Sequence, residues 1–299
     1  MHVEMPVRAA SLVSRCTFPS GGSQVTCAVS GGADSLALLV LAVTAGCEVS
    51  AIHVDHGVRE GSAQEADVVR AAAARFGASF RAVQVKVEPG PNLEARLRAA
   101  RYSVLPAGSL TGHTADDQAE TVLLNLVRGS GISGLAGMRR DRHPILSLRR
   151  WETAALCETL GLQPVVDPSN HSPAHRRNRI RHEVLPLLDD VAGRDVSVLL
   201  TRLAELARGE DEWLECAASV IDPTDAVALA AAPLPLARRA VRAWLTSSLG
   251  GYPPRLDDVD RVLSVARGDR VACELAGGIH VRRSHQRLAA RTLRDAPQR

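Results

Sequence analysis

Short apolar runs and longer amphipathic stretches alternate along the first half of the chain. The short runs are rich in β-branched residues, as in buried strands, and the longer stretches repeat apolar residues at helical spacing. We expect strands at residues 25–29, 48–54, 80–87 and 107–112, and helices at residues 33–46, 62–77, 91–105 and 115–128. Four strand-then-helix units in succession predict an α/β domain with a parallel sheet covered on both faces, and ligands outside the carboxyl ends of its strands.

A change of pattern near residue 190 predicts a domain boundary. Before it, one last unit is expected as strand 145–148, helix 150–161 and strand 164–166. After it, the expected elements are helices 195–219 and 234–248, and a hairpin between residues 273–278 and 279–290 that turns at two glycines. We therefore expect residues 1–190 to form the sheet domain and residues 191–299 to form a smaller, mainly helical domain.

Composition excludes several classes of protein. Of the 299 residues, 45% are hydrophobic and 23% are charged, which suits a globular chain with a real core. No long apolar run occurs, and the N-terminus lacks the basic flank and apolar core of an export signal, so we expect a cytoplasmic protein without membrane contact. The six cysteines show no CxxC spacing, which argues against a zinc ribbon, an iron–sulfur cluster or a disulfide framework and favours buried, reduced thiols.

The net charge of +3 and the pI near 8.7 are only mildly basic, so a nucleic acid would have to be bound by local patches. Lys86 is the only lysine, and the other cations are arginines, which make bidentate contacts to phosphates. Aromatic residues make up only 3% of the chain, which argues against a protein that reads single strands by stacking.

The sharpest local motif joins the first expected strand to the first helix, and it consists of Ser30, Gly31, Gly32, Ala33, Asp34 and Ser35. Small residues before a helix N-terminus leave free N–H groups and a positive dipole end, which predicts a cradle for phosphate or pyrophosphate. The motif is not a Walker loop, because Asp34 stands where its lysine would be. An acid beside phosphates makes sense if Mg²⁺ bridges them or if the acid opposes a cationic substrate group. The alternative is a plain tight turn with Ser35 in the cap region.

A second acidic motif opens the helix expected at residues 115–128. His113 and Thr114 precede it, and Asp116, Asp117 and Glu120 lie in its first turns. Acids are ordinary partners of a helix N-terminus, but Asp116 and Glu120 are four residues apart and repel each other. A cation, either Mg²⁺ or a substrate ammonium, would relieve that repulsion.

Two weaker candidates lie near other strand ends. His53 ends the second expected strand, where a ligand contact and a polar loop are equally compatible with the pattern. Arg101 lies on the third helix, where a solvated charge pair is the simpler alternative.

Two arginine-rich segments complete the candidates. Arg128 begins a glycine-rich stretch that continues to Gly137, and it is compatible with either a mobile cover for a polyanion or a plain connection. The second segment holds Arg176, Arg177, Arg179 and Arg181. Four arginines in so short a segment exceed the nearby acids, Asp167 and Glu183, so phosphate contact is favoured over a solvated face.

Together these segments resemble the PP-loop ATP pyrophosphatases and, within them, the tRNA(Ile)-lysidine synthetase family. The resemblance covers residues 25–187 and is carried by SGGADS, HVDHGVRE, NLEARLRAARY, GHTADDQAETVLLNLVRGSGISGLAGM, and DPSN followed by RRNRIRHEVLP. The later helical part is similar to the family's tRNA-binding region only loosely. One position departs from the family: many members have a second histidine where this chain has Thr114.

The resemblance implies a two-step ligation. ATP would adenylate the C2 oxygen of the wobble cytidine of tRNA(Ile) with a CAU anticodon, releasing pyrophosphate, and the side-chain amine of free L-lysine would then displace AMP to give lysidine. The first domain would bind ATP and catalyse both steps, and the second would bind the tRNA. Whether the chain forms a homodimer is left open.

The same resemblance implies roles for individual residues. The cradle residues 30–35 would bind ATP, with Asp34 holding Mg²⁺, and His53 would contact adenosine. Asp117 would hold and deprotonate the lysine ammonium, while Arg101 and Arg181 would bind phosphate or the adenylated intermediate. The expected substrate-binding residues are His113, Asp116, Glu120, Arg128, Arg176, Arg177 and Arg179.

Three other functions fit parts of the sequence. A tRNA sulfurtransferase would need a reactive cysteine near the site, and only Cys27 lies close, inside a buried strand. An amidotransferase-type synthetase would need a glutaminase domain, for which there is no room. A nucleotide-binding module without catalysis would leave the acids after His113 and the arginine cluster without a role.

Overall fold

The computed structural model describes residues 7–55, 57, 62–87, 90, 93–166, 172, 175–248 and 254–292. The chain divides into two compact units, residues 1–207 and residues 208–299, which are described separately. The DPSN segment at residues 167–170 and part of the HVDHGVRE segment lie outside the described residues. None of the helices within the described ranges is long and apolar enough to span a bilayer.

The first unit is built on the predicted parallel sheet. Its strands are β1 (Gln24–Ala28), β2 (Glu48–Asp55), β3 (Ser79–Gln84) and β4 (Leu110–Thr111), in the order β3-β2-β1-β4 with every pair parallel. The helices are α1 (Val7–Val13), α2 (Ala33–Thr44), α3 (Ser62–Phe76), α4 (Leu93–Val104) and α5 (Ala115–Val127). The predicted fold class is confirmed, and α1, which precedes the sheet, is an addition to the expected elements.

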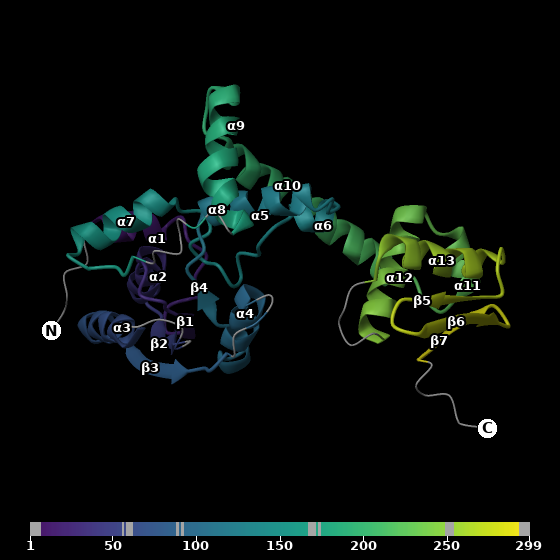
Figure 1. The fold of residues 1–299 in the computed structure, drawn as a ribbon, viewed down its shortest axis with the longest axis horizontal. Helices are drawn as coiled ribbons and strands as arrows, with labels where there is room; N and C mark the ends of the chain where they lie inside the picture. Colours follow the sequence, from purple (N-terminus) through teal and green to yellow (C-terminus); the bar gives the residue numbers. More distant parts are fainter. Residues whose placement is uncertain are drawn as a thin grey trace. The chain divides into compact units, whose positions relative to one another are not determined.

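Helix α2 forms the centre of the first core. All residues from Ser35 to Ala42 are buried, so the helix is covered nearly all round, by α1, α3 and α7 (Arg150–Thr159) together with the sheet. Figure 1 shows α1, α2 and α7 side by side. Because α2 starts at the end of β1, this packing fixes the position of the predicted phosphate cradle.

Two expected strands are wrong. Residues 145–148 form successive turns whose side chains Ile145, Leu146 and Leu148 are buried, and residues 164–166 form no ladder, although Val165 N–H donates to Gly31 O at 3.0 Å. A short buried apolar run has no periodicity that separates a strand from a packed turn. Pro144 and Pro164 also lack the N–H group that a ladder needs.

The first unit continues with α6 (Ile132–Leu135), α7, α8 (Arg176–Arg179), a π-helical turn η2 (Ile180–Val184) and α9 (Leu185–Ala192), and α10 (Val196–Ser219) runs into the second unit. Helix α5 packs on α8 and η2, and the apolar residues Ala119, Val122, Leu123, Ile180, Leu185, Leu200 and Ala204 form a second small core there. The division between the compact units falls within α10. That the ATP-binding domain ends near residue 190 stays a prediction, because the division into compact units does not test where ATP binding ends.

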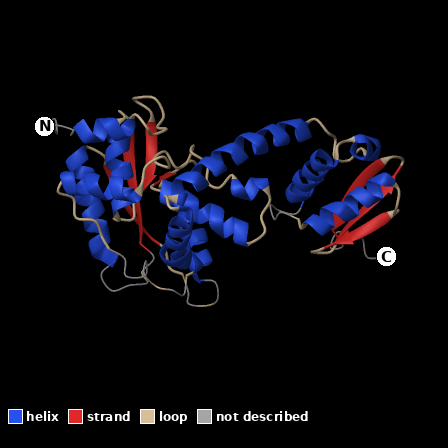
Figure 2. Cartoon of the chain, turned by 90° about the horizontal axis from the view of Figure 1, so that it is seen from above, coloured by secondary structure: helices blue, strands red, loops and turns tan. Residues whose placement is uncertain are grey.

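The second unit holds α11 (Ala226–Ala231), α12 (Leu234–Ser248) and α13 (Leu256–Arg267), followed by β5 (Ala272–Leu275), β6 (Ile279–Ser284) and β7 (Arg287–Thr292). The strands form an antiparallel sheet in sequence order, drawn in red in Figure 2. The predicted hairpin at Gly277 and Gly278 is present, but the single arm expected at residues 279–290 is two strands. They turn at His285 and Gln286, which adopt positive φ angles of 47° and 61° without a glycine to signal the turn.

Candidate active site

The predicted cradle is a closed turn between β1 and α2. Ser35 Oγ accepts hydrogen bonds from Ser30 N–H at 3.1 Å and from Ser30 Oγ at 3.2 Å, and it donates to Gly32 O at 2.8 Å. Among the described residues, the N–H groups of Gly32, Ala33 and Asp34 donate to no partner. These groups lie at the N-terminus of α2, so they remain available to an anion.

Two glycines make room for this turn. Gly31 has a φ of +91°, and a Cβ there would lie 3.2 Å from the side chain of Val165. Gly112, just after β4, passes so close that a Cβ would lie 2.6 Å from the backbone oxygen of Asp34. Only glycine at position 112 lets the end of β4 pack directly against the cradle.

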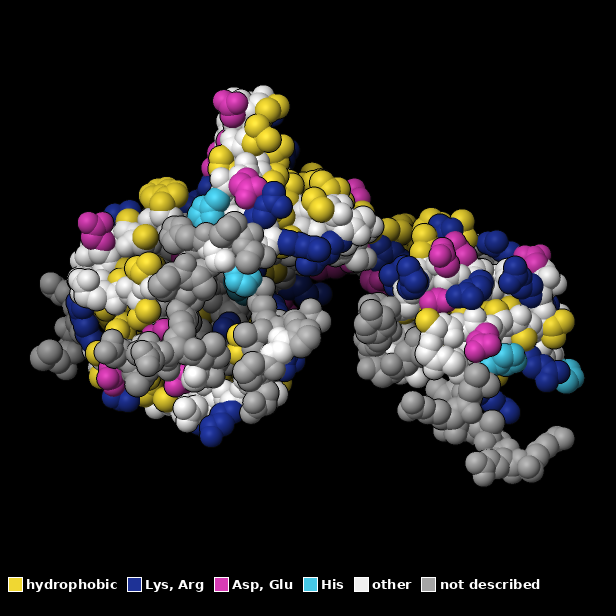
Figure 3. Space-filling view, viewed as in Figure 1, with side chains coloured by type: hydrophobic (Ala, Val, Ile, Leu, Met, Phe, Trp, Pro, Cys, Tyr) yellow, Lys and Arg dark blue, Asp and Glu magenta, His cyan; other side chains and the backbone are white. Residues whose placement is uncertain are grey.

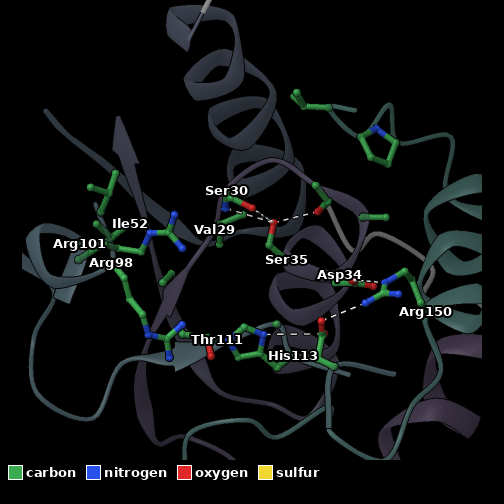
Figure 4. Close-up of a pocket in the computed structure, with 18 of the residues that line it drawn as sticks. Val29, Ser30, Asp34, Ser35, Ile52, Arg98, Arg101, Thr111, His113 and Arg150 are labelled. Atoms are coloured by element: carbon green, nitrogen blue, oxygen red, sulfur yellow. Dashed lines mark hydrogen bonds and ion pairs between the residues drawn. The ribbon is translucent and has the colours of Figure 1, made fainter. Parts of the chain in front are cut away.

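A pocket of about 470 Å³ opens beside the cradle. It is lined by the cradle, by the ends of β1, β2 and β4, and by four arginines, Arg98, Arg101, Arg150 and Arg181. In Figure 4, Arg150 points at Asp34 from one side, and Arg98 and Arg101 enter from the other. The pocket therefore combines an anion site with guanidinium groups that suit phosphates.

Asp34, the acid of the cradle, contacts α7 through its side chain. Its carboxylate accepts a hydrogen bond from the Thr153 hydroxyl, and Arg150 Nε lies 3.6 Å from its second oxygen. Burial raises the pKa of Asp34 to about 6, although the bond from Thr153 opposes that rise. A carboxylate with this pKa is mostly ionised at neutral pH and gains from a cation nearby.

Asp117 and Glu120 form a buried carboxylate pair on α5. Glu120 is fully buried, with Arg177 Nε and Arg181 Nε each 2.6 Å from one of its oxygens, and Arg150 Nη2 at 3.3 Å. One oxygen of Asp117 accepts from Arg150 at 3.0 Å and from Arg177 at 3.1 Å. Burial alone would raise the pKa of Asp117, but His113 and these guanidinium groups hold it well below its usual range.

Thr114, the position that departs from the family's pattern, orients Asp117. Thr114 is fully buried, and both its N–H, at 2.9 Å, and its hydroxyl, at 3.1 Å, donate to the second oxygen of Asp117. The threonine thus begins α5 and fixes the orientation of the acid at the same time.

Asp116 faces away from the pocket lining. Arg149 donates to the Asp116 carboxylate from both Nε and Nη2, the latter at 2.9 Å. The backbone N–H of Arg150 donates to the same carboxylate at 2.7 Å. Arg149 also pairs with Asp195. Asp116 therefore joins the N-termini of α5 and α7, and its expected role in substrate binding stays a prediction.

His113 lines the pocket, and a second histidine, His143, packs against it. His113 Nδ1 is 3.8 Å from Asp117, and the ring of His143 packs edge-on against His113 with centroids 4.9 Å apart. Thr111 Oγ1 and His143 Nδ1 are 2.6 Å apart. Burial lowers the pKa of His143 to about 4, so this ring is neutral at neutral pH.

Several predicted residues lie away from this cluster. His53 is buried with Nδ1 2.9 Å from Val29 O, and its neighbours Ile52 and Val54 line the pocket instead. Arg128 is exposed at the far end of α5. The remaining two, Arg176 and Arg179, are exposed on α8, where Arg179 pairs with Glu183 at 2.8 Å. Their expected roles stay predictions.

The most important residue missing from the expectations is Arg150. Together with Thr153 it links α7 to Asp34 and to the acids of α5. A signal was present, because two arginines at a helix N-terminus oppose the helix dipole and indicate acidic partners nearby. His143 and Arg98 had no such signal.

The glycine-rich connection after α5 is held in place. Gln118 Oε1 accepts from Met138 N–H at 2.8 Å, and Asn125 Nδ2 donates to Gly134 O at 2.8 Å. Gly134 belongs to the short helix α6, and Met138 follows that helix. The anchoring favours a plain connection over a mobile cover.

The cysteines follow the expectation in part. All six are free thiols; Cys27, Cys47, Cys157 and Cys273 are buried, Cys16 is partly buried and Cys216 is exposed. Burial raises the pKa of both Cys27 and Cys157, the two nearest the cradle, to about 12. Neither is a reactive thiolate.

Comparison with known proteins decides the family. A PP-loop domain family matches residues 5–188, and the family described as the TilS substrate binding domain matches residues 225–289. The chain is 42% identical to the tRNA(Ile)-lysidine synthase of Nocardia farcinica (strain IFM 10152) over 84% of this chain and 85% of the relative. The chain belongs to the tRNA(Ile)-lysidine synthase family. The synthase of Rhodococcus opacus (strain B4) is 44% identical over 75% of this chain and 74% of its own.

A solved structure supports the fold independently. The U34-tRNA thiolase NcsA from Methanococcus maripaludis superposes with a TM-score of 0.53, at 17% identity, over 67% of this chain and 78% of that one. At this identity the likeness shows the α/β fold alone. The resemblance drawn from the sequence motifs is therefore confirmed at the level of family and fold.

Proposed function

We propose that this protein joins L-lysine to C2 of the wobble cytidine of tRNA(Ile) with a CAU anticodon. In the first step, the C2 oxygen attacks the α-phosphorus of ATP and pyrophosphate leaves. In the second, the lysine side-chain amine attacks C2, a proton is lost from the amine, and AMP leaves. The observation that carries the proposal is that one pocket is lined both by the cradle and by Asp117, which shares Arg177 with the buried Glu120.

The cradle suits the first step. The N–H groups of Gly32, Ala33 and Asp34 and the guanidinium groups of Arg98 and Arg101 can bind the charge that develops on the departing pyrophosphate. Such stabilisation is strongest in a site that already holds its donors in place.

Mg²⁺ fits this half of the site. Nucleotide-bound Mg²⁺ commonly takes one or two protein carboxylates and completes its shell with phosphates and water. Asp34 supplies one carboxylate beside the cradle, while no three Cys, His, Asp or Glu side chains in the described ranges are grouped as a ready metal site. When bound, Mg²⁺ would neutralise phosphate charge, with Asp34 as its protein ligand.

The acids of α5 suit the second step. Asp117 and Glu120 are the carboxylates that can hold a lysine ammonium, and His113 lies beside Asp117. Arg181, which lines the pocket and contacts Glu120, can bind the phosphate of the adenylated intermediate.

The second unit supplies a surface for the tRNA. On the face of its sheet turned away from the core, His280, Arg282 and Arg291 are exposed, with His280 directly opposite Arg291 across the strands. The arginine side chains of this unit are interspersed with acids on the face seen in Figure 3. The match to a substrate-binding domain supports tRNA contact here, with Arg128, Arg176 and Arg179 as further phosphate contacts in the first unit. A tRNA substrate also supports the expected cytoplasmic location of the reaction.

The exchange of labelled pyrophosphate into ATP tests the first step. Wild type should catalyse it with unmodified tRNA(Ile) carrying the CAU anticodon and without lysine, whereas a methionine tRNA should not support it. Asp34→Ala should reduce exchange by at least about a hundredfold. Exchange that needs no tRNA, or an unaffected Asp34→Ala variant, would contradict the proposal.

A further inference from the structure

The carboxylates assigned to lysine are already fully paired. Asp117 gives one oxygen to Arg150 and Arg177 and the other to Thr114. Both oxygens of Glu120 lie within 3.3 Å of guanidinium nitrogens. A lysine ammonium therefore has no free carboxylate oxygen, and at least one guanidinium must leave before it can bind.

The charges of the cluster point the same way. Asp34, Asp117 and Glu120 carry three negative charges, and Arg150, Arg177 and Arg181 balance them. A balanced cluster has little attraction for another cation. If one arginine moves away from the cluster, the cluster is left with a net charge of −1. The single positive charge of a lysine side chain would neutralise it.

Arg150 is the arginine best placed to leave. Arg177 and Arg181 each hold Glu120 with a 2.6 Å bond, whereas Arg150 makes single contacts of 3.0, 3.3 and 3.6 Å to three different acids. Its side chain is also 31% exposed and lines the pocket beside the cradle.

The phosphates of a bound nucleotide would attract Arg150. Its guanidinium lies between the cradle and the acids of α5, since it contacts both Asp34 and Asp117. A triphosphate in the cradle offers the paired oxygens that arginine binds most strongly. We propose that Arg150 blocks the lysine site of the free protein and swings to the phosphates of ATP, so that lysine binds after the nucleotide. This inference rests on the proposed function.

Order of binding has a chemical consequence. If lysine enters only after Arg150 has moved, its amine reaches Asp117 only when ATP is already bound. ATP is the reactant that makes C2 of the cytidine electrophilic. By linkage, lysine must in turn strengthen the binding of the nucleotide by the same factor.

Lysine binding to the full chain tests the proposal. Equilibrium dialysis with labelled L-lysine should be run with and without Mg²⁺ and α,β-methylene-ATP, which cannot be cleaved at the bond that adenylation breaks. Wild type should bind lysine at least about tenfold tighter with the analogue, a coupling of ordinary allosteric size. Arg150→Gln should bind lysine without the analogue within about threefold of its affinity with the analogue.

Two variants guard against misfolding and general charge effects. Arg150→Lys keeps the blocking charge and should retain the coupling. Arg70→Gln removes a charge whose partner is Asp67 on α3, outside the pocket, and it should behave as wild type. Thermal melting should confirm that each variant is folded.

Two results would overturn the inference: equal lysine affinity with and without the analogue in wild type, or full coupling in Arg150→Gln. Absence of lysine binding in both states would overturn it as well. The proposed function fails by a different readout, the absence of lysidine from the complete reaction with tRNA.

Discussion

Arg181 Nε lies 2.6 Å from Glu120 Oε1, and this ion pair joins the π-helical turn η2 to helix α5. Glu120 is fully buried and also contacts Arg150 and Arg177. It therefore pairs with three guanidinium groups beside the pocket. The residue is both a structural centre and a candidate for substrate binding.

Glu120→Gln should destabilise the first unit strongly. The neutral amide leaves three guanidinium groups without their shared counter-charge, and breaking a buried ion pair of this kind costs about 3–5 kcal/mol. Urea unfolding followed by circular dichroism measures the loss. Glu183→Gln, which removes an exposed partner of Arg179, is the matched control and should leave the unfolding free energy nearly unchanged, because solvent screens this pair. Equal effects of the two variants would refute the role given to Glu120.

Asp34→Asn should change the pH dependence of stability in a defined direction. Burial raises the pKa of Asp34 from 3.8 to about 6, so the folded protein binds this proton more tightly than the unfolded chain does. Wild type should therefore lose stability relative to Asp34→Asn as the pH rises from about 4 through about 6. Above that window the variant should be more stable by about 1–3 kcal/mol. A difference that does not vary with pH would contradict this account.

Gly112→Ala should disturb the cradle through the backbone. The added Cβ would meet Asp34 O at 2.6 Å, so either the end of β4 or the start of α2 must move. We expect a loss of about 1–3 kcal/mol in unfolding free energy and at least a tenfold fall in pyrophosphate exchange. Gly131→Ala serves as the comparison, since nothing lies within 4 Å of a Cβ there and its φ is −74°. A variant at position 112 that exchanges pyrophosphate as fast as the one at 131 would rule out the close approach.

Thr153→Val should weaken the first step without unfolding the chain. Valine keeps the shape of the fully buried threonine but removes the hydroxyl that donates to Asp34. A hydrogen bond to a charged group contributes about 1.5–3 kcal/mol, so exchange should slow by about tenfold or more. Thr153→Ser restores the donor and should recover most of the rate. If serine were no better than valine, the hydroxyl would have no part in positioning Asp34.

The sequence was most informative where pattern and chemistry are local. The period of the apolar residues is enough to predict the parallel sheet, and the small residues from Ser30 to Ser35 predict the cradle. The failures lie where the local sequence carries no distinctive signal. Ile145, Leu146 and Leu148 are apolar and buried in turns, which periodicity cannot distinguish from a strand, and the turn at His285 and Gln286 carries no glycine.

The candidate site shows the same division. Asp117, Glu120 and Arg181 could be singled out from their motifs, but their mutual contacts join segments about sixty residues apart, and only the fold brings them together. Arg150 lies at the start of a helix whose sequence is otherwise ordinary. Its role in the site depends on its contacts with Asp34, Asp117 and Glu120, which only the fold brings near it.

The most direct test of the whole account is mass spectrometry of the nucleosides of unmodified tRNA(Ile) after incubation with ATP, Mg²⁺ and L-lysine. Wild type should convert the wobble cytidine to lysidine. A folded Asp117→Asn variant should retain pyrophosphate exchange but form little or no lysidine, because the neutral amide cannot pair with the positive charge of the lysine ammonium. Absence of lysidine with wild type, or its undiminished formation by Asp117→Asn, would contradict the account.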